Sequence, residues 1–162
     1  MNLKALRFVV LVLSTLTVGM KLAHVLELTP KLQLPPDIYI VVQTQLYQLF
    51  GTLGPIIDLA MVIGTMVLAF HVYHQKAFPY TVLGLAAMIL SLIIWVLFVL
   101  PANMPLNEWQ TSGVIPADWT RWRDQWQYGQ LASFVCDLIG YCLVLFSVIR
   151  ETPSQKFMSA SN

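Results

Sequence analysis

Residues 78–100, FPYTVLGLAAMILSLIIWVLFVL, decide the fold, because this stretch contains no charged residue. At a rise of about 1.5 Å per residue, a helix of this length exceeds the roughly 30 Å of a bilayer core. The rest of the chain has a similar character, since 57% of its 162 residues are hydrophobic and 10% are charged. A soluble domain carries about 25% charged residues. The sequence therefore predicts an integral membrane protein that is partnered by the lipid bilayer.

Three further apolar segments are long enough to cross a bilayer as helices, namely residues 5–27, 53–74 and 130–150. Asp58 interrupts the second of these segments and Asp137 the third. No proline lies in the middle of an apolar segment, and Pro55 is expected to open the span that it precedes. The predicted fold class is all-α, a four-helix transmembrane bundle that forms a single domain over residues 1–151.

The first segment also resembles a secretory signal, because a short apolar stretch follows Lys4 and Arg7. The pattern beyond it favours an uncleaved helix. At 100° per residue, four polar side chains fall within about 120° of one another: Lys21, His24, Glu27 and Lys31. A polar stripe of this kind is typical of a helix that faces protein.

Residues 28–52 and 101–129 are predicted to form a cap at the outer end of the bundle. Tyr39, Gln43 and Tyr47 recur at i, i+4 and i+8, which is typical of a helix ahead of the second span. That helix either projects from the membrane or bends near Gly51, Gly54 and Pro55. Residues 116–150 indicate one long helix, so helices two and four extend beyond the membrane, and residues 101–115 are expected to be a loop. Residues 152–162 are predicted to be a disordered tail.

The distribution of charge predicts the orientation. With four spans, both termini lie on the same side of the membrane. That side has five basic residues and one acidic residue, Glu151, whereas the numbers on the opposite side are nearly balanced. We therefore expect a multi-pass protein of the plasma (cytoplasmic) membrane with both termini in the cytoplasm. The net charge of +1, without a basic run, excludes a nucleic-acid partner on electrostatic grounds.

Three helices bring ionisable groups to a similar depth. Counted from the charged helix ends, Lys21, Asp137 and Asp58 lie about 9, 10 and 6 Å beneath the outer surface. Since an isolated charge there costs several kcal/mol, we expect Lys21 to pair with Asp137 or Asp58, with His24 nearby and Glu27 at the outer interface. Two interpretations remain open. The groups form either a structural network or a hydrated site opening outward, in which His24 is the best general acid or base.

Tryptophans crowd the last outer segment together with Arg121 and Arg123. Four of the five lie there: Trp109, Trp119, Trp122 and Trp126. They suit either an aromatic belt at the membrane surface or the wall of a pocket for a flat apolar ligand, with an arginine to hold an oxygen. His71 and His74 have the spacing of metal ligands but lack a third partner, so we expect no metal and no cofactor.

Four stretches of the chain carry a resemblance to a known family: HVLELTPKL at 24–32, IYIVVQTQLYQLFG at 38–51, LPANMPLNEW at 100–109 and WRDQWQYGQLASF at 122–134. In this order they resemble the anthrone oxygenase-like family of small four-helix membrane proteins, and the resemblance covers nearly the whole chain. It implies cofactor-free oxidation of a polycyclic phenolic anthrone to an anthraquinone. Where relatives commonly show Trp, Glu, two further residues and His, this chain has Gln127 after Trp126 and Gln130 in place of His, and amides do not transfer protons at neutral pH.

The predicted site follows from the residues and the resemblance together. His24 is the catalytic candidate, and the buried charge network comprises Lys21, Glu27, Asp58 and Asp137. The ligand-binding candidates are Asn103, Asn107, Arg123, Trp126, Gln130, Tyr47 and Gln43. We expect His24, Asn103 and Arg123 to converge on one outer cavity walled by Trp126 and Tyr47.

Three function classes remain open at this point. The first is an enzyme that oxidises a lipophilic aromatic small molecule, the second a non-catalytic binding or transport component, and the third a structural subunit of a membrane complex. A homo-oligomer is compatible with each of them.

Overall fold

In the computed structural model, which describes residues 2–151, every regular element of the described chain is a helix. The elements in chain order are α1 (Leu3–Leu26), α2 (Leu28–Leu32), α3 (Pro36–Val41), the π-helical turn η1 (Val42–Leu46), α4 (Gln48–His71), α5 (Phe78–Ile94), the π-helical turn η2 (Trp95–Val99), α6 (Leu100–Asn103), α7 (Leu106–Ser112) and α8 (Trp119–Glu151). The tail predicted at residues 152–162 lies outside the described residues.

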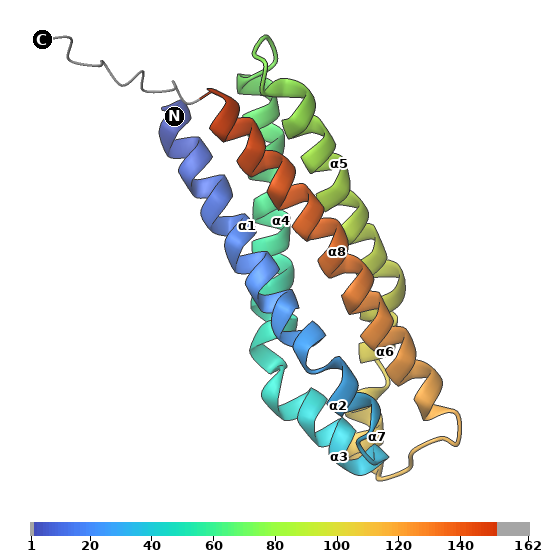
Figure 1. Ribbon diagram of the computed structural model, residues 1–162. Coiled ribbons are helices and arrows are strands. Elements are labelled where there is room, and N and C mark those ends of the chain that lie inside the picture. Colours follow the sequence, from blue (N-terminus) through green and yellow to red (C-terminus); the bar gives the residue numbers. More distant parts are fainter. Residues whose placement is uncertain (1, 152–162) are drawn as a thin grey trace, which may run out of the picture.

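Four long apolar helices pack side by side, which confirms the all-α class and the four-helix bundle (Figure 1). The candidate membrane spans are Leu3–Leu26, Gln48–His71, Phe78–Ser112 and Trp119–Glu151. The third of these continues from α5 through η2, α6 and α7. Four spans of this length and composition indicate a multi-pass integral membrane protein.

The two ends of the bundle differ in construction. At one end, the beginning of α1 lies beside the end of α8 (Figure 1), where Arg7 forms an ion pair with Glu151. The backbone N–H of Ala77, in the α4–α5 turn, donates to the same carboxylate at 3.1 Å. The opposite end carries α2, α3 and α7 as a cap of short helices.

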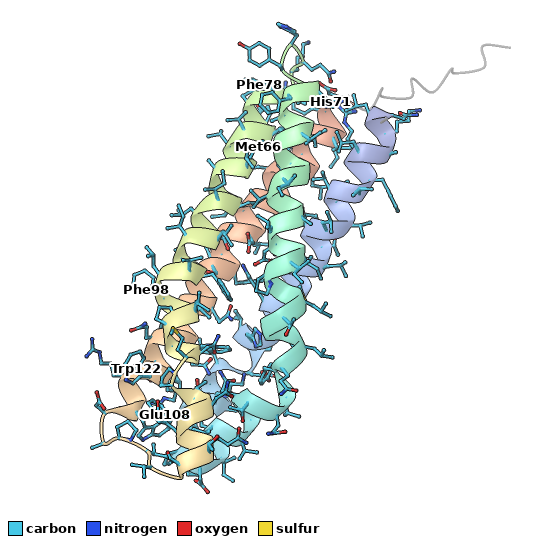
Figure 2. The ribbon with its side chains drawn as sticks, turned by 180° about the vertical axis from the view of Figure 1, so that it is seen from behind. Met66, His71, Phe78, Phe98, Glu108 and Trp122 are labelled. Atoms are coloured by element: carbon cyan, nitrogen blue, oxygen red, sulfur yellow. The ribbon has the colours of Figure 1, made fainter. Side chains whose placement is uncertain are left out.

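The outer surface of the long helices is apolar. Large side chains such as Phe8, Phe70 and Leu97 are 69%, 75% and 60% exposed, and Figure 2 shows side chains projecting around the bundle along its length. A soluble monomer rarely leaves such a surface in water. The surface matches hydrocarbon, as the composition predicted.

Helices α5 and α8 come close together at a pair of glycines. A Cβ built on Gly84 would lie 2.9 Å from the carbonyl oxygen of Gly140 and 2.9 Å from Cγ2 of Val144. A Cβ on Gly140 would lie 2.8 Å from Cγ of Met88. Small residues of this kind allow backbones to come together where no hydrophobic effect drives helix association.

The break before the second span corrects one prediction. The bend falls at Tyr47, where η1 ends with φ −104° and ψ 13°, and α4 then runs without interruption through Gly51, Gly54 and Pro55. Pro55 therefore lies inside the helix and does not open it. Tertiary contacts of Tyr47 with Glu27 and His24 outweigh the local glycine and proline preferences.

The loop predicted at residues 101–115 is also wrong, because α6 and α7 occupy most of it. Leu106 and Trp109, three residues apart on α7, pack against Tyr39 and Ile40 of α3. This shared apolar cluster stabilises two helices that would be too short to persist alone. Gly113, with φ +69°, ends α7 in the left-handed conformation that glycine accepts without strain.

Candidate functional site

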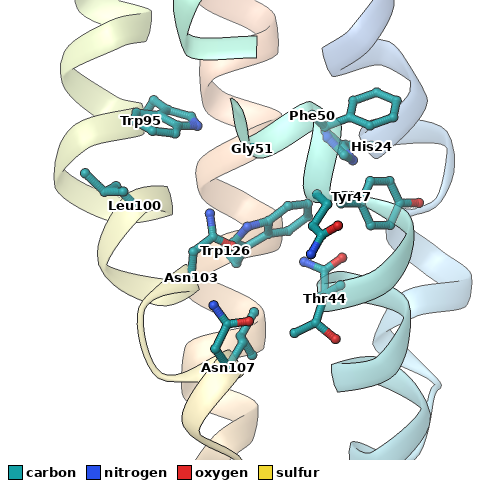
Figure 3. Close-up of a pocket in the computed structure, with 13 residues that line it drawn as sticks. His24, Thr44, Tyr47, Phe50, Gly51, Trp95, Leu100, Asn103, Asn107 and Trp126 are labelled. Carbon is teal, nitrogen blue, oxygen red and sulfur yellow. The ribbon is translucent and has the colours of Figure 1, made fainter. Parts of the chain in front are cut away.

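A cavity of about 270 Å³ lies between the ends of the four long helices and the cap. Every long helix or its extension contributes to its wall. The lining residues are His24, Gln43, Thr44, Tyr47, Gln48, Phe50, Gly51, Trp95, Leu100, Asn103, Leu106, Asn107 and Trp126. Figure 3 shows Asn103 and Asn107 on one side, Tyr47 and Thr44 on the other, and Trp126 between them. We refer to this space as the main cavity.

His24 sits in a cage of aromatic rings at the wall of the main cavity. Its ring centre lies 4.8 Å from that of Tyr47, 5.2 Å from that of Phe50 and 5.1 Å from that of Trp126. The side chain is 5% exposed, and its Nδ1 has no hydrogen-bond partner within the described chain. The imidazole is therefore held in place by packing, and its Nδ1 is a buried polar atom without a partner in the described chain.

A second group of side chains closes the cap over the cavity. The Lys31 ammonium donates to Glu27 at 2.9 Å and to Gln43 at 3.2 Å, and the Tyr47 hydroxyl donates to Glu27. The ammonium also lies over the rings of Tyr47 and Trp126, 3.8 and 5.0 Å from their centres. We call Glu27, Lys31, Gln43 and Tyr47 the cap cluster.

The environment of the cap cluster shifts the pKa values of Glu27, Lys31 and Tyr47. Burial lowers the pKa of Lys31, against the opposing effect of the Glu27 carboxylate. Burial and then the Glu27 carboxylate raise the pKa of Tyr47. Burial alone would raise the pKa of Glu27, but the hydrogen bonds from Tyr47 and Lys31 outweigh it and hold that pKa below its ordinary value.

Deeper in the bundle, the predicted pairing of Lys21 is confirmed with both carboxylates. Lys21 Nζ lies 2.5 Å from Asp137 Oδ2 and 2.9 Å from Asp58 Oδ2, and it donates to Ser91 Oγ at 3.0 Å. Thr17 donates to Asp58 Oδ1 at 2.9 Å. All these residues are buried. We call Lys21, Asp58 and Asp137 the Lys21 cluster.

A small cavity of about 30 Å³ shares lining residues with both regions. His24 lines both this space and the main cavity. The remaining lining of the small cavity includes Lys21, Asp58, Gly54 and Trp95. The charged groups of the Lys21 cluster are therefore separated from the main cavity by the His24 side chain and a space large enough for water.

The structure brings six of the eight predicted catalytic and ligand-binding residues to the main cavity, and Glu27, predicted in the buried charge network, pairs with Lys31 and not with Lys21. His24, Gln43, Tyr47, Asn103, Asn107 and Trp126 line the main cavity. Arg123 does not, because its guanidinium donates to the carbonyl of Leu32 at 2.8 Å and to Asp124 at 2.8 Å. Gln130 is buried but is likewise absent from the lining. The prediction that Arg123 lines the cavity is therefore wrong. Its guanidinium is instead hydrogen-bonded to a backbone carbonyl of α2.

The tryptophans divide between two roles. Trp126 forms a wall of the main cavity, whereas Trp109, Trp119 and Trp122 belong to packed apolar clusters of the cap. Trp95, on the third span, lines both cavities. No pattern in the sequence pointed to Trp95, Thr44 and Phe50 as lining residues. The central position of Lys31 in the cap cluster was not predicted either, although for Lys31 a signal existed, because Glu27 and Lys31 stand at i and i+4.

Within residues 2–151 no group of three His, Cys, Asp or Glu side chains is placed to hold a metal ion. His71 instead directs its Nδ1 to the carbonyl of Val67 at 2.8 Å. No protein-family model matches the chain, and neither a curated protein nor a solved structure matches it. The chemistry must therefore be inferred from the site itself.

Proposed function

We propose that this multi-pass membrane protein binds one small lipophilic aromatic molecule in the main cavity. The single observation that carries the proposal is the composition of the wall, in which the rings of His24, Tyr47, Phe50, Trp95 and Trp126 meet the amides of Asn103 and Asn107. Aromatic walls with a few polar groups are the usual form of a small-molecule site. The volume of about 270 Å³ is near the lower end of the roughly 300–1,000 Å³ of such sites.

The polar groups define the second property of the ligand. The asparagine side chains of Asn103 and Asn107 both donate and accept hydrogen bonds. A ligand that carries a phenolic hydroxyl or a ring carbonyl would satisfy these groups, whereas a hydrocarbon would leave them unpaired. The resemblance to the anthrone oxygenase-like family points to the same chemical class.

The proposed setting is the plasma membrane with both termini in the cytoplasm. In this arrangement α3 with η1, and the beginning of α8, extend beyond the membrane on the outer side, and the main cavity faces outward. Cysteines introduced at Gln33 and Ser112, in a background without Cys136 and Cys142, should react with an impermeant reagent in intact cells. A cysteine at Lys76 should not, and the reverse pattern would place the cavity on the cytoplasmic side.

Binding is tested with the purified protein. Mass spectrometry and absorption spectroscopy of the protein in mild detergent should reveal a retained aromatic compound. Titration with 1,8-dihydroxyanthrone should quench tryptophan fluorescence, because Trp95 and Trp126 line the cavity. Asn107→Leu should weaken binding by about tenfold, the effect of one lost hydrogen bond.

Gln110→Leu is the matched control, since Gln110 lies on the same helix and is exposed but does not line the cavity. Equal quenching of both variants would refute binding in the main cavity.

A second candidate function is cofactor-free oxidation of such a ligand, favoured by the position of the His24 side chain at the wall of the main cavity. The overall reaction would be anthrone plus O₂ giving anthraquinone plus water. A neutral imidazole at this position could accept the proton that the substrate loses. His24→Gln should then abolish O₂-dependent anthraquinone formation while binding of 1,8-dihydroxyanthrone persists, and unchanged product formation would remove this candidate.

A further inference from the structure

The Lys21 cluster contains one cation and two carboxyl groups. Lys21 Nζ is within 2.5 Å of Asp137 Oδ2 and 2.9 Å of Asp58 Oδ2, so a single ammonium serves both. If both carboxyl groups were ionised, the cluster would carry one excess negative charge. The cluster lies inside candidate membrane spans and is almost fully buried, where an uncompensated charge is expensive.

The surrounding residues offer little compensation for that charge. On α1 the titratable groups facing the cluster are Lys21 itself and His24, on α4 Asp58, and on α8 Asp137 with the neighbouring Cys136. Helix α5 contributes the neutral Ser91. Lys31 and Glu27 lie beyond His24 and already pair with each other. Within the described residues, therefore, no further cation contacts the two carboxyl groups.

The two carboxyl groups differ in how their oxygens are satisfied. Asp58 receives Thr17 Oγ1 on Oδ1 and Lys21 on Oδ2. Asp137 receives Lys21 and Ser91 on Oδ2, whereas its Oδ1 is buried without a hydrogen-bond partner in the described chain. A buried anionic oxygen without a donor carries a large desolvation penalty. Protonation of that oxygen removes the charge and with it most of the penalty.

We propose that the Lys21 cluster is a proton-binding site, in which Asp137 carries a proton on Oδ1 and Asp58 forms the ion pair with Lys21. The cluster as a whole is then neutral. Two carboxyl groups that share one site commonly hold one proton between them, because the first ionisation opposes the second. This inference stands independently of the ligand proposed for the main cavity.

The geometry also supplies a route for the proton. Lys21 and Asp58 line the small cavity of about 30 Å³, and His24 lines both that cavity and the main one. The small cavity holds water if its polar lining supplies two or more partners, and here it supplies the Lys21 ammonium, the Asp58 carboxylate and the His24 imidazole. The proposed route for the proton therefore runs from bulk water through the main cavity, the small cavity and the Lys21–Asp58 pair to Asp137, which itself lines neither cavity.

Infrared spectroscopy of the full-length protein in detergent tests the proton directly. A protonated carboxylic acid gives a carbonyl stretching band that a carboxylate lacks. At neutral pH the wild-type protein should show this band. Asp137→Asn should remove it, because the carboxyl group that holds the proton is no longer present. Asp58→Asn should remove it as well, because the excess charge is gone and Asp137 then ionises opposite Lys21.

The matched control is Asp118→Asn, which changes an exposed acid outside the helices and should leave the band intact. Absence of the band in the wild-type protein, or its persistence in Asp137→Asn, would overturn the assignment. Persistence in Asp58→Asn alone would overturn the charge-compensation mechanism.

The proposed proton route can be tested with substitutions that leave all three residues of the Lys21 cluster unchanged. Transfer into D₂O shifts the carboxylic acid band, and its rate reports access of water to Asp137. Gly54→Leu fills the small cavity, and no atom lies within 4 Å of a Cβ built at Gly54. This variant should slow the shift several-fold, whereas Gly19→Leu, an equally unobstructed position outside both cavities, should not. Equal exchange rates in the two variants would refute the proposed route.

Discussion

The ammonium nitrogen of Lys31 lies 3.8 Å from the centre of the Tyr47 ring and is 5.0 Å from that of Trp126. Lys31 belongs to α2, Tyr47 to the bend between η1 and α4, and Trp126 to α8. This cation on α2 therefore contacts two other elements, the bend at residue 47 and the first part of α8. It also pairs with Glu27 at 2.9 Å, which fixes the end of α1 to the same point.

Lys31→Met should destabilise the protein by about 1–3 kcal/mol, the combined scale of a charged hydrogen bond and a partly buried cation–π contact. Methionine keeps much of the side-chain length but removes the charge. The free energy of unfolding in mixed detergent micelles measures the effect. Lys76→Met, at an exposed position in the α4–α5 turn, should change it by less than about 0.5 kcal/mol.

Acidification should weaken the cap cluster. The contacts of Tyr47 and Lys31 outweigh burial and hold the pKa of Glu27 below its ordinary 4.5. A depressed carboxyl pKa stabilises the fold at pH values above 4.5, and this contribution is lost as the pH falls through the folded-state value. The melting temperature of Glu27→Gln should therefore lie below that of the wild-type protein at pH 7, with the gap closing in acid. A gap that stays constant with pH would contradict this assignment.

Gly84→Ala should destabilise the bundle, because its methyl group would meet the Gly140 carbonyl oxygen and Val144 at 2.9 Å. Overpacking of this kind costs about 1–3 kcal/mol. Gly19→Ala is the matched change on α1, where the added methyl group meets no atom within 4 Å. That variant should be neutral or slightly stabilised, because alanine has the higher helix propensity, and a similar loss in both variants would mean that the α5–α8 contact does not account for the effect of Gly84→Ala.

Lys21→Met should cost about 3–5 kcal/mol, as expected when one partner of a buried ion pair is removed. The variant that combines Lys21→Met with Asp58→Asn and Asp137→Asn should recover a large part of the loss, because no charge then remains in the cluster. Unfolding free energies of the single and combined variants form the test. Additive losses would show that Lys21 and the two carboxyl groups are solvated independently.

The positions of the spans and of the Lys21 cluster could be predicted from the sequence because both depend on local or regular quantities. An uncharged apolar segment as long as residues 78–100 predicts a membrane-spanning helix by its length alone. The depth of Lys21, Asp58 and Asp137 follows from a constant rise per residue. Their side chains face one another because separated charges in hydrocarbon have few alternatives.

The contacts of the cap could not be predicted from the sequence, because they depend on residues that are distant in the chain. Arg123 was expected at the cavity, but the carbonyl of Leu32, distant in the sequence, binds it at 2.8 Å. The bend at Tyr47 depends on a hydrogen bond to Glu27, and no local pattern of glycine or proline marks it. In the cap many partners compete for each polar group, so sequence spacing no longer determines the contacts.

The two π-helical turns have a consequence for how this cavity is specified. Each accommodates one residue more than the α-helical turn it replaces, and both flank the main cavity: η1 supplies Gln43 and Thr44, and Trp95 begins η2. Deleting one residue from either turn would close it to a regular α-helical turn, so the flanking helices would keep their register while the lining side chains on the turn itself move around the helix axis. The number of residues in each of these two turns therefore determines the shape of the main cavity, as does the identity of its lining side chains. A homologue with every lining residue but a single-residue gap at η1 or η2 would keep the bundle and lose the cavity.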